Sequence, residues 1–435
     1  MNKGQTISAT PKRVGVLTAL ISFFTLVLMG MTGPLWQPQT QFPQVPLVSM
    51  AIGWPTWVGW GALGGMVASV AALLWLSQIG QQVYSQAWRQ TASLSLFGSY
   101  VLLVVINQHR LQPWAYQFVV GLLILSCLSA ERAIQWFRLL VISIYFYSAL
   151  SKFDLTFLQT LGQQLLDGLL QAMHIAGDGW SWNTRLILVA MFPLVELLTA
   201  CGLACHKTRQ AALLLSLSLH TLLLLALGPL GLDHHRGVLG WNVYFMIQNV
   251  ILFRPAKEFH ELTHHTKGAE RNWMTVSWLI KSGSTLVLVA PCLGWIGYFD
   301  HWPSWGLYAA HHDRLTLFVT ETEIHRLPPS IRPFIDAPQT PHRWCRVRMD
   351  RWSLETLKAP LYPQSRFHLG VAIGLGKDLQ QTASDLNPDA TIKVILEDGA
   401  HRLTGKRHSQ ECIGLAEVES LADKYWLNVW PVFRY

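Results

Sequence analysis

Long apolar segments fill most of the first 300 residues and constrain the fold more than any other feature of the chain. The first acidic residue is Glu131. A soluble protein with so few acids over that length would be hard to keep in solution. A helix needs about 20 mostly apolar residues to cross a bilayer, and about nine runs approach this length: Val14–Met31, Trp57–Leu76, Thr91–Ile106, Trp114–Ala130, Ala133–Leu150, Arg185–Cys205, Gln210–Leu230, Val238–Phe253 and Val276–Tyr298. The pattern predicts an all-α polytopic membrane bundle.

The charge distribution supports a membrane protein rather than a nucleic-acid-binding one. Charged residues make up 13% of the chain and hydrophobic residues 51%, and the formal net charge is +8. Much of the positive excess lies in short segments between apolar runs, which reports membrane topology. Because no basic stripe with interleaved aromatic residues is present, we expect no nucleic-acid partner.

The basic connections also predict an orientation, since cytoplasmic loops of membrane proteins are rich in Lys and Arg. The cationic connections are the N-terminus, Ser77–Gln90, Glu131–Arg132, His206–Arg209 and Arg254–Arg271, whereas Pro34–Thr56 has no charge. With nine crossings, the N-terminus would be cytoplasmic and the C-terminus extracytoplasmic, as in a multi-pass protein of a bacterial inner membrane. Leu155–Met173 is less apolar and is typical of an interfacial amphipathic helix.

From about Phe299 the composition changes to that of a water-soluble domain. We therefore expect two domains, a transmembrane helical domain at residues 1–299 and an extracytoplasmic domain at residues 300–435. The second should be a small α+β domain, with strands at Leu315–Val319, Cys345–Met349 and Ile392–Leu396. Ser353 is expected to cap a helix that begins at Ser353–Leu357. Cys345 and Cys412 would be able to form a disulfide in an oxidising compartment.

Polar side chains at membrane depth are candidates for function because they are costly to bury in lipid. Such residues within or at the outer ends of the runs are Asn107, Gln108, His109, Arg110, Lys152, Asp154, Glu196, His220, Asn242, Gln248 and Asn249. The predicted topology places several of them in the outer half of the bundle. We expect them to line one cavity that opens to the outside.

Lys152 allows two interpretations. It is either an interfacial lysine that extends to water or a desolvated lysine whose neutral amine acts as a base. Asp154 is a candidate partner that would keep it charged. Glu196, well inside a run, needs a partner or a proton. We predict no metal site, because the adjacent His234 and His235 are more typical of a polar loop and the sequence has no HExxH motif.

Three segments carry a resemblance to a known family. They are Asn107–Phe118, Tyr145–Asp154, and His220 followed by Gly240–Met246. Together they resemble the HTTM (horizontally transferred transmembrane) family, which includes the vitamin K-dependent gamma-carboxylases. The resemblance implies that Lys152 is a catalytic base that deprotonates a reduced quinone, as in a carboxylase of the lyase class, and that His220 is a catalytic histidine of the same cavity. The substrate-binding candidates are then Arg110, Trp114, Tyr147, Glu196 and Asn242.

Two hypotheses of different classes remain open at this point. The first is a membrane enzyme that acts on a quinol or another lipid-soluble small molecule, with a reduced quinone as its cofactor. The second is a non-enzymatic membrane protein, either a transporter or a scaffold that presents the outer domain to a protein partner. A transporter is expected to contain an inverted repeat of interrupted helices, and the sequence has no repeat of that kind.

Overall fold

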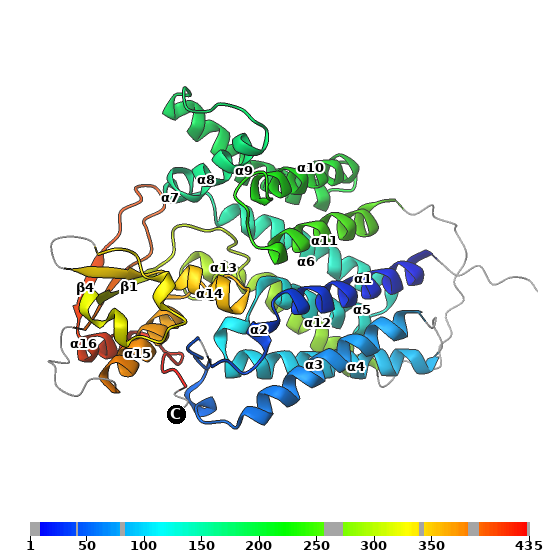
Figure 1. Ribbon diagram of the computed structural model, residues 1–435. Coiled ribbons are helices and arrows are strands. Elements are labelled where there is room, and N and C mark those ends of the chain that lie inside the picture. The colour runs from blue at the N-terminus through cyan, green and yellow to red at the C-terminus, as the bar shows by residue number, and fades with distance from the viewer. Residues whose placement is uncertain are drawn as a thin grey trace, which may run out of the picture.

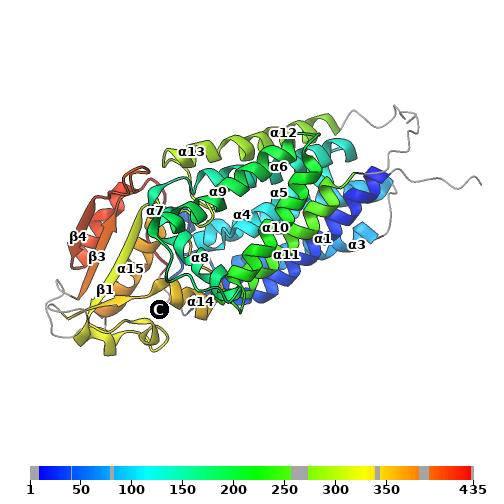
Figure 2. The same cartoon turned by 90° about the horizontal axis from the view of Figure 1, so that it is seen from above.

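The computed structural model describes residues 9–40, 42–78, 83–255, 273–338, 343–381 and 391–432. The predicted cytoplasmic loop after Arg254 lies almost entirely outside these residues, as does the start of the N-terminal segment. Figure 1 shows a helical bundle with a smaller region containing a sheet packed at one end. Figure 2 shows the same arrangement from above, with the sheet beyond the ends of the long helices.

Each of the nine predicted apolar runs lies largely within a helix or a helix pair. The bundle contains α1 (Ala9–Met31), α2 (Gly33–Trp36), α3 (Thr56–Gln78), α4 (Val83–Ile106), α5 (Pro113–Cys127), α6 (Ala130–Leu150), α7 (Leu155–Gln159), α8 (Leu161–Ala172), α9 (Trp182–Ala204), α10 (Arg209–Leu227), α11 (Arg236–Phe253), α12 (Trp273–Val289) and α13 (Pro291–Trp295). Short 3-10 turns at Ser49–Ala51 and Gln108–Arg110 interrupt the connections at the end of the bundle that meets the sheet region.

Seven helical segments are long and apolar enough to cross a bilayer: α1, α3, most of α4, α6, α9, α10 and the segment Ser277–Trp295 that joins α12 and α13. Helix α5 is apolar but has only 15 residues. These lengths and compositions agree with a multi-pass membrane protein, while the count of nine spans stays a prediction.

The sheet region has the α+β character that the composition predicts. Four antiparallel strands lie in the order β2 (Trp344–Val347), β1 (Arg314–Thr320), β3 (Ile392–Glu397) and β4 (Ser409–Ile413). Helices α14 (Met349–Leu357), α15 (Ser365–Gln381) and α16 (Leu415–Ser420) accompany the sheet. The remaining 3-10 turns are at Glu321–Arg326, Arg332–Phe334 and Leu421–Lys424. The three predicted strands are confirmed, and β4 was not predicted.

Two expectations for this region need correction. Ser353 does not cap a helix: it lies inside α14, which begins at Met349, and its hydroxyl donates to the Ala359 carbonyl at 2.8 Å. Cys345 and Cys412 are both free thiols. They lie on β2 and β4, the two outer strands of the sheet. Since neighbouring strands are about 4.8 Å apart, this order separates the two thiols too far for a disulfide.

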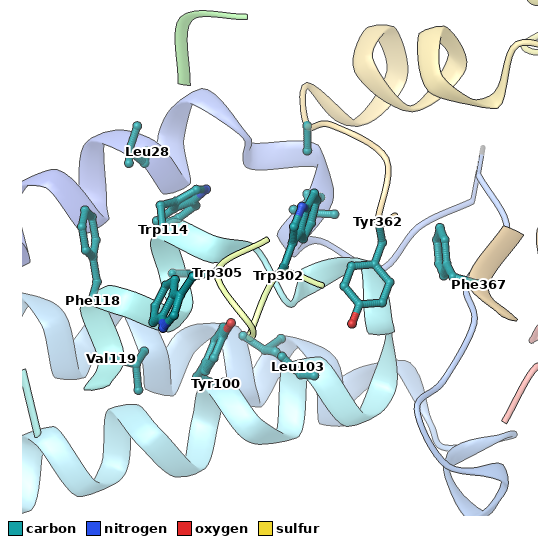
Figure 3. Close-up of a cluster of buried hydrophobic side chains, with 14 of the residues drawn as sticks. Leu28, Tyr100, Leu103, Trp114, Phe118, Val119, Trp302, Trp305, Tyr362 and Phe367 are labelled. Atoms are coloured by element: carbon teal, nitrogen blue, oxygen red, sulfur yellow. The ribbon is translucent and has the colours of Figure 1, made fainter. Parts of the chain in front are cut away.

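A continuous core joins the bundle to the sheet region. The segment that connects α13 to β1 inserts Trp302 and Trp305 among bundle side chains such as Trp114 and Phe118 (Figure 3). The ring of Trp302 also packs edge-on against Tyr362 of the sheet region, with ring centroids 5.3 Å apart. Burial of large aromatic rings is a strong source of packing energy. The two regions are therefore held together by a shared apolar core.

Hydrogen bonds reinforce this junction at the residues before α5. The Gln108 amide donates to the carbonyls of Pro46 and Asn428 at 2.9 and 2.8 Å and accepts from Arg366 at 2.8 Å. The His109 ring is 3.0 Å from the Pro360 carbonyl oxygen. The side chains of Gln108, His109, Arg366 and Asn428 are buried, so each bond also prevents the cost of an unpaired polar group. The junction holds the sheet region in one position over the end of the bundle.

Candidate active site

A cavity of about 380 Å³ lies where the bundle meets the sheet region. Its walls come from α5, α6, α8, α9, α10 and α11, and its outer side, the side towards the sheet region, is lined by the segment before β1 and by α14. Most of the lining is apolar, with Leu, Ile, Val and aromatic side chains. Cavities of this size and character are typical of sites for small, largely apolar molecules. The polar lining residues of the bundle include Tyr145, Lys152, Glu196, His220 and Asn242.

The cavity contains a buried ion pair. The Lys152 ammonium donates to both carboxylate oxygens of Glu196, with Nζ to Oε2 at 2.8 Å and Nζ to Oε1 at 3.0 Å. The same Nζ donates to the carbonyl and hydroxyl oxygens of Ser148 at 3.0 and 2.6 Å. Lys152 is 3% exposed and Glu196 8%. A lysine that reached out to bulk water would be far more exposed, so Lys152 is buried in a site and not extended to solvent.

Local geometry explains how Lys152 and Glu196 meet. Helix α6 ends at Leu150, and Lys152 follows in the first turn beyond it, so its side chain folds back over the carbonyl of Ser148. Glu196 lies on α9, one turn after Pro193. Asp154, the expected alternative partner of Lys152, instead caps α7 by accepting the Phe157 backbone N–H at 2.8 Å. The partner therefore comes from a neighbouring helix and not from the same loop.

A second polar chain lines the same cavity through His220. Asn242 donates its amide N–H to the Val238 carbonyl at 2.9 Å, which leaves its Oδ1 to face His220 Nδ1 at 2.8 Å. Nδ1 must therefore carry the proton, and Nε2 is the acceptor. Tyr145 then donates its hydroxyl to Nε2 over 2.5 Å. His220 is held as a neutral imidazole of one tautomer, with its ring stacked on Phe245 at a centroid distance of 5.0 Å.

Amides deeper in the bundle extend this chain. Asn249 donates to the Tyr145 hydroxyl oxygen at 2.7 Å, and Gln248 lies beside it. Gln248 Oε1 accepts from Gln117 at 3.0 Å, and Gln117 in turn accepts from the Trp241 indole at 2.9 Å. These groups are buried, where interhelical hydrogen bonds add stability and fix side-chain positions. The amides therefore hold Tyr145 and His220 rigidly in place.

The structure brings together most, but not all, of the predicted site residues. Trp114, Lys152, Glu196, His220 and Asn242 line the cavity. The lining does not include Arg110 or Tyr147. Arg110 is buried at the junction, where its guanidinium donates to the Leu35 and Gln37 carbonyls at 3.1 and 2.8 Å. The Tyr147 hydroxyl donates to the Leu288 carbonyl at 2.9 Å, on the side of α6 that faces α12.

Some lining residues were not predicted from the sequence. Tyr145 is one of them, although its spacing of three residues from Ser148 and seven from Lys152 is that of one helical face. Asp350, Arg351 and Leu354 of α14 line the outer side. No local signal connects α14 to Lys152, since their contact with one cavity depends on the docking of the sheet region.

Among the described residues, no group of three or more His, Cys, Asp or Glu side chains is arranged to hold a metal ion. His234 and His235 line the cavity instead. No family model, no curated protein and no solved structure matches the chain in the comparisons made.

Proposed function

We propose that the chain is a multi-pass membrane enzyme of the HTTM type that removes a proton from a hydroxyl group of a lipid-soluble substrate. A reduced quinone is the substrate class that best fits this chemistry, with Lys152 as the base. The observation that carries the proposal is the buried Lys152–Glu196 pair facing a largely apolar cavity. An apolar cavity with a few convergent polar groups is the usual character of a ligand-binding or active site.

The ion pair defines how a proton can be accepted. The Lys152 ammonium has no free lone pair, whereas Glu196 has lone pairs to spare. Lys152 therefore acts as a base by passing one proton to Glu196 and taking the substrate proton in its place. Afterwards Glu196 is neutral, and the Lys152 ammonium lies beside the new substrate oxyanion. The net charge of the site stays at zero, which avoids the large cost of an isolated charge in a low-dielectric site.

His220 has a different part in this proposal. Its Nε2 already accepts from Tyr145, and its Nδ1–H is used by Asn242, so the ring has no free polar atom for the substrate in the resting site. The chain Asn242–His220–Tyr145 instead presents polarised groups on the wall of the same cavity. When the Tyr145 O–H bond rotates towards the substrate, with the oxygen kept in place, His220 Nε2 becomes a proton acceptor. We propose that His220 and Tyr145 form this second acid–base unit.

Oxygen consumption by the purified protein tests the proposal. The protein is reconstituted in lipid vesicles and supplied with a short-chain 1,4-naphthoquinol, and oxygen uptake is recorded. We expect uptake by the wild type, loss of at least about a hundredfold with Lys152→Ala, and wild-type rates with Lys281→Ala. Lys281 is a half-buried lysine of α12 that does not line the cavity.

Full turnover by Lys152→Ala would remove this residue from the mechanism. A wild type that oxidises none of a panel of benzoquinols and naphthoquinols would favour the alternative, a transporter or scaffold without catalytic activity.

A further inference from the structure

The cavity has two chemically different ends. The Lys152–Glu196 pair and the His220 chain lie on or beside the bundle helices α6, α9, α10 and α11, and we call this part of the lining the inner end. The outer end is the part of the lining towards the sheet region, and it includes His234 and His235, on the connection from α10 to α11, and Asp350 and Arg351 of α14. A small quinol ring needs only the inner end. The residues of the outer end are therefore available to bind a further part of the ligand.

Charge pairing at the outer end leaves a cation without a partner. Arg348 donates to both carboxylate oxygens of Asp350 at 3.1 and 2.9 Å, which neutralises this acid. Partial desolvation raises the pKa of the Asp350 carboxyl, but these two bonds outweigh it and lower the pKa, so Asp350, whose side chain is 56% exposed, stays an ion. Within the described part of the chain, the Arg351 guanidinium makes no ion pair or hydrogen bond. Its five N–H donors are suited to an anion.

Two histidines line the same cavity as Arg351. The His234 ring stacks on Tyr308, with centroids 6.4 Å apart, and within the described residues its nitrogens have no hydrogen-bond partner. His235 uses Nδ1 to accept the Gly237 backbone N–H at 3.2 Å, which leaves Nε2 as the protonated nitrogen. The outer end thus carries the fixed positive charge of Arg351 and two imidazoles, while its acid, Asp350, is already paired with Arg348.

We propose that His234, His235 and Arg351 bind the anionic group, a phosphate or a carboxylate, of an amphipathic molecule whose apolar body fills the cavity. This inference rests on the proposed function in that the same molecule is the substrate of the Lys152–Glu196 pair. It makes α14 of the sheet region part of the substrate site. The bundle and the sheet region then contact one ligand together, which explains why the junction between them is tightly packed.

Binding of simple probes to the reconstituted full-length protein tests this site. Octyl phosphate, octanol and inorganic phosphate are titrated by calorimetry into nanodiscs of a zwitterionic lipid, with empty nanodiscs as the blank. We expect octyl phosphate to bind at least about tenfold more tightly than either of the other two, because it alone uses both ends of the cavity. We also expect Arg351→Gln to weaken octyl phosphate about tenfold or more, and Arg351→Lys to weaken it less.

The matched control is Arg346→Gln, which removes an exposed arginine from β2 outside the cavity. Leu354→Trp is a second variant, since it fills the outer wall and should weaken octyl phosphate and octanol alike. Equal binding of octyl phosphate and octanol, with no effect of Arg351→Gln, would overturn the proposal. Inorganic phosphate binding as tightly as octyl phosphate would assign the outer end to a free anion and would also overturn it.

The outcomes separate this site from the proposed reaction. Arg351-dependent binding of octyl phosphate by a protein that oxidises no quinol would refute the proposed function and leave the anion site in place. Quinol oxidation that depends on Lys152, with octyl phosphate binding unchanged in Arg351→Gln, would refute only the anion site.

Discussion

The stability of Lys152 and Glu196 variants gives a quantitative prediction about the buried pair. Glu196→Leu leaves the Lys152 ammonium, 3% exposed, with only the two oxygens of Ser148 as acceptors. Breaking a buried ion pair in this way costs about 3–5 kcal/mol. The double variant Lys152→Met/Glu196→Leu removes both charges, and such replacements are neutral or stabilising by about 1–4 kcal/mol. We therefore expect the double variant to be more stable than Glu196→Leu alone by at least about 3 kcal/mol.

The second single variant should show a matching loss. Lys152→Met leaves the Glu196 carboxylate, 8% exposed, without its cation, and we expect a cost of about 3–5 kcal/mol here as well. Equilibrium unfolding in mixed micelles, followed by near-UV circular dichroism, measures all four proteins. Additive effects of the two substitutions would refute a coupled buried pair.

Three further predictions concern the surroundings of the site. Tyr145→Phe leaves His220 Nε2 and one Asn249 N–H without their present partner. We expect the free energy of unfolding to fall by about 1–3 kcal/mol in the same assay. An unchanged stability would contradict the hydrogen-bond chain. Asn428→Ala removes one of the two donors to the Pro46 carbonyl, 2.9 Å away. We expect it to destabilise the junction by about 1 kcal/mol and to speed proteolytic release of the sheet region. Wild-type protease resistance would contradict this. Burial raises the pKa of Asp313, but His301 and Ser365 outweigh burial and lower it from 3.8 to about 2. Because this folded-state pKa is depressed, the stabilisation is present above pH 3.8 and is lost as the pH falls towards 2. The carboxylate is a third exposed, so we expect this stabilisation of the folded state to be about 1 kcal/mol. Asp313→Asn should therefore reduce the loss of thermal stability at acid pH. An unchanged acid-side dependence of the unfolding temperature would exclude this contribution.

The sequence was informative for the bundle because spanning helices depend on local composition. Apolar runs such as Val14–Met31 need no tertiary partner to be recognised, and the helix found there extends only a few residues further. The sheet region depends more on tertiary contacts. Helix α15 contains Gly370, Gly374 and Gly376, which disfavour a helix locally. Gly370 is nevertheless suited to its place, since a Cβ there would be 2.4 Å from the Val429 carbonyl oxygen.

The residues of the site could be predicted from the sequence only in part. The cost of polar groups in lipid singles out Lys152, Glu196, His220 and Asn242 without any structure, and these residues do line one cavity. Their pairing was not predictable, because Lys152 and Glu196 are 44 residues apart and meet only through the packing of α6 on α9. Arg110 shows the converse: a buried charged residue next to an apolar run that serves the junction and not the cavity.

The ionisation state of a bound fluorescent naphthol tests the central claim most directly. Phenolic hydroxyls ordinarily have a pKa near 10, so the free compound is almost entirely neutral at pH 7.5. If the Lys152–Glu196 pair accepts a proton from a bound hydroxyl, the absorption of the bound naphthol at that pH should show the naphtholate. The signal should be lost in Lys152→Met/Glu196→Leu and retained in Lys281→Ala. A naphthol that binds the wild type but stays neutral would contradict the account.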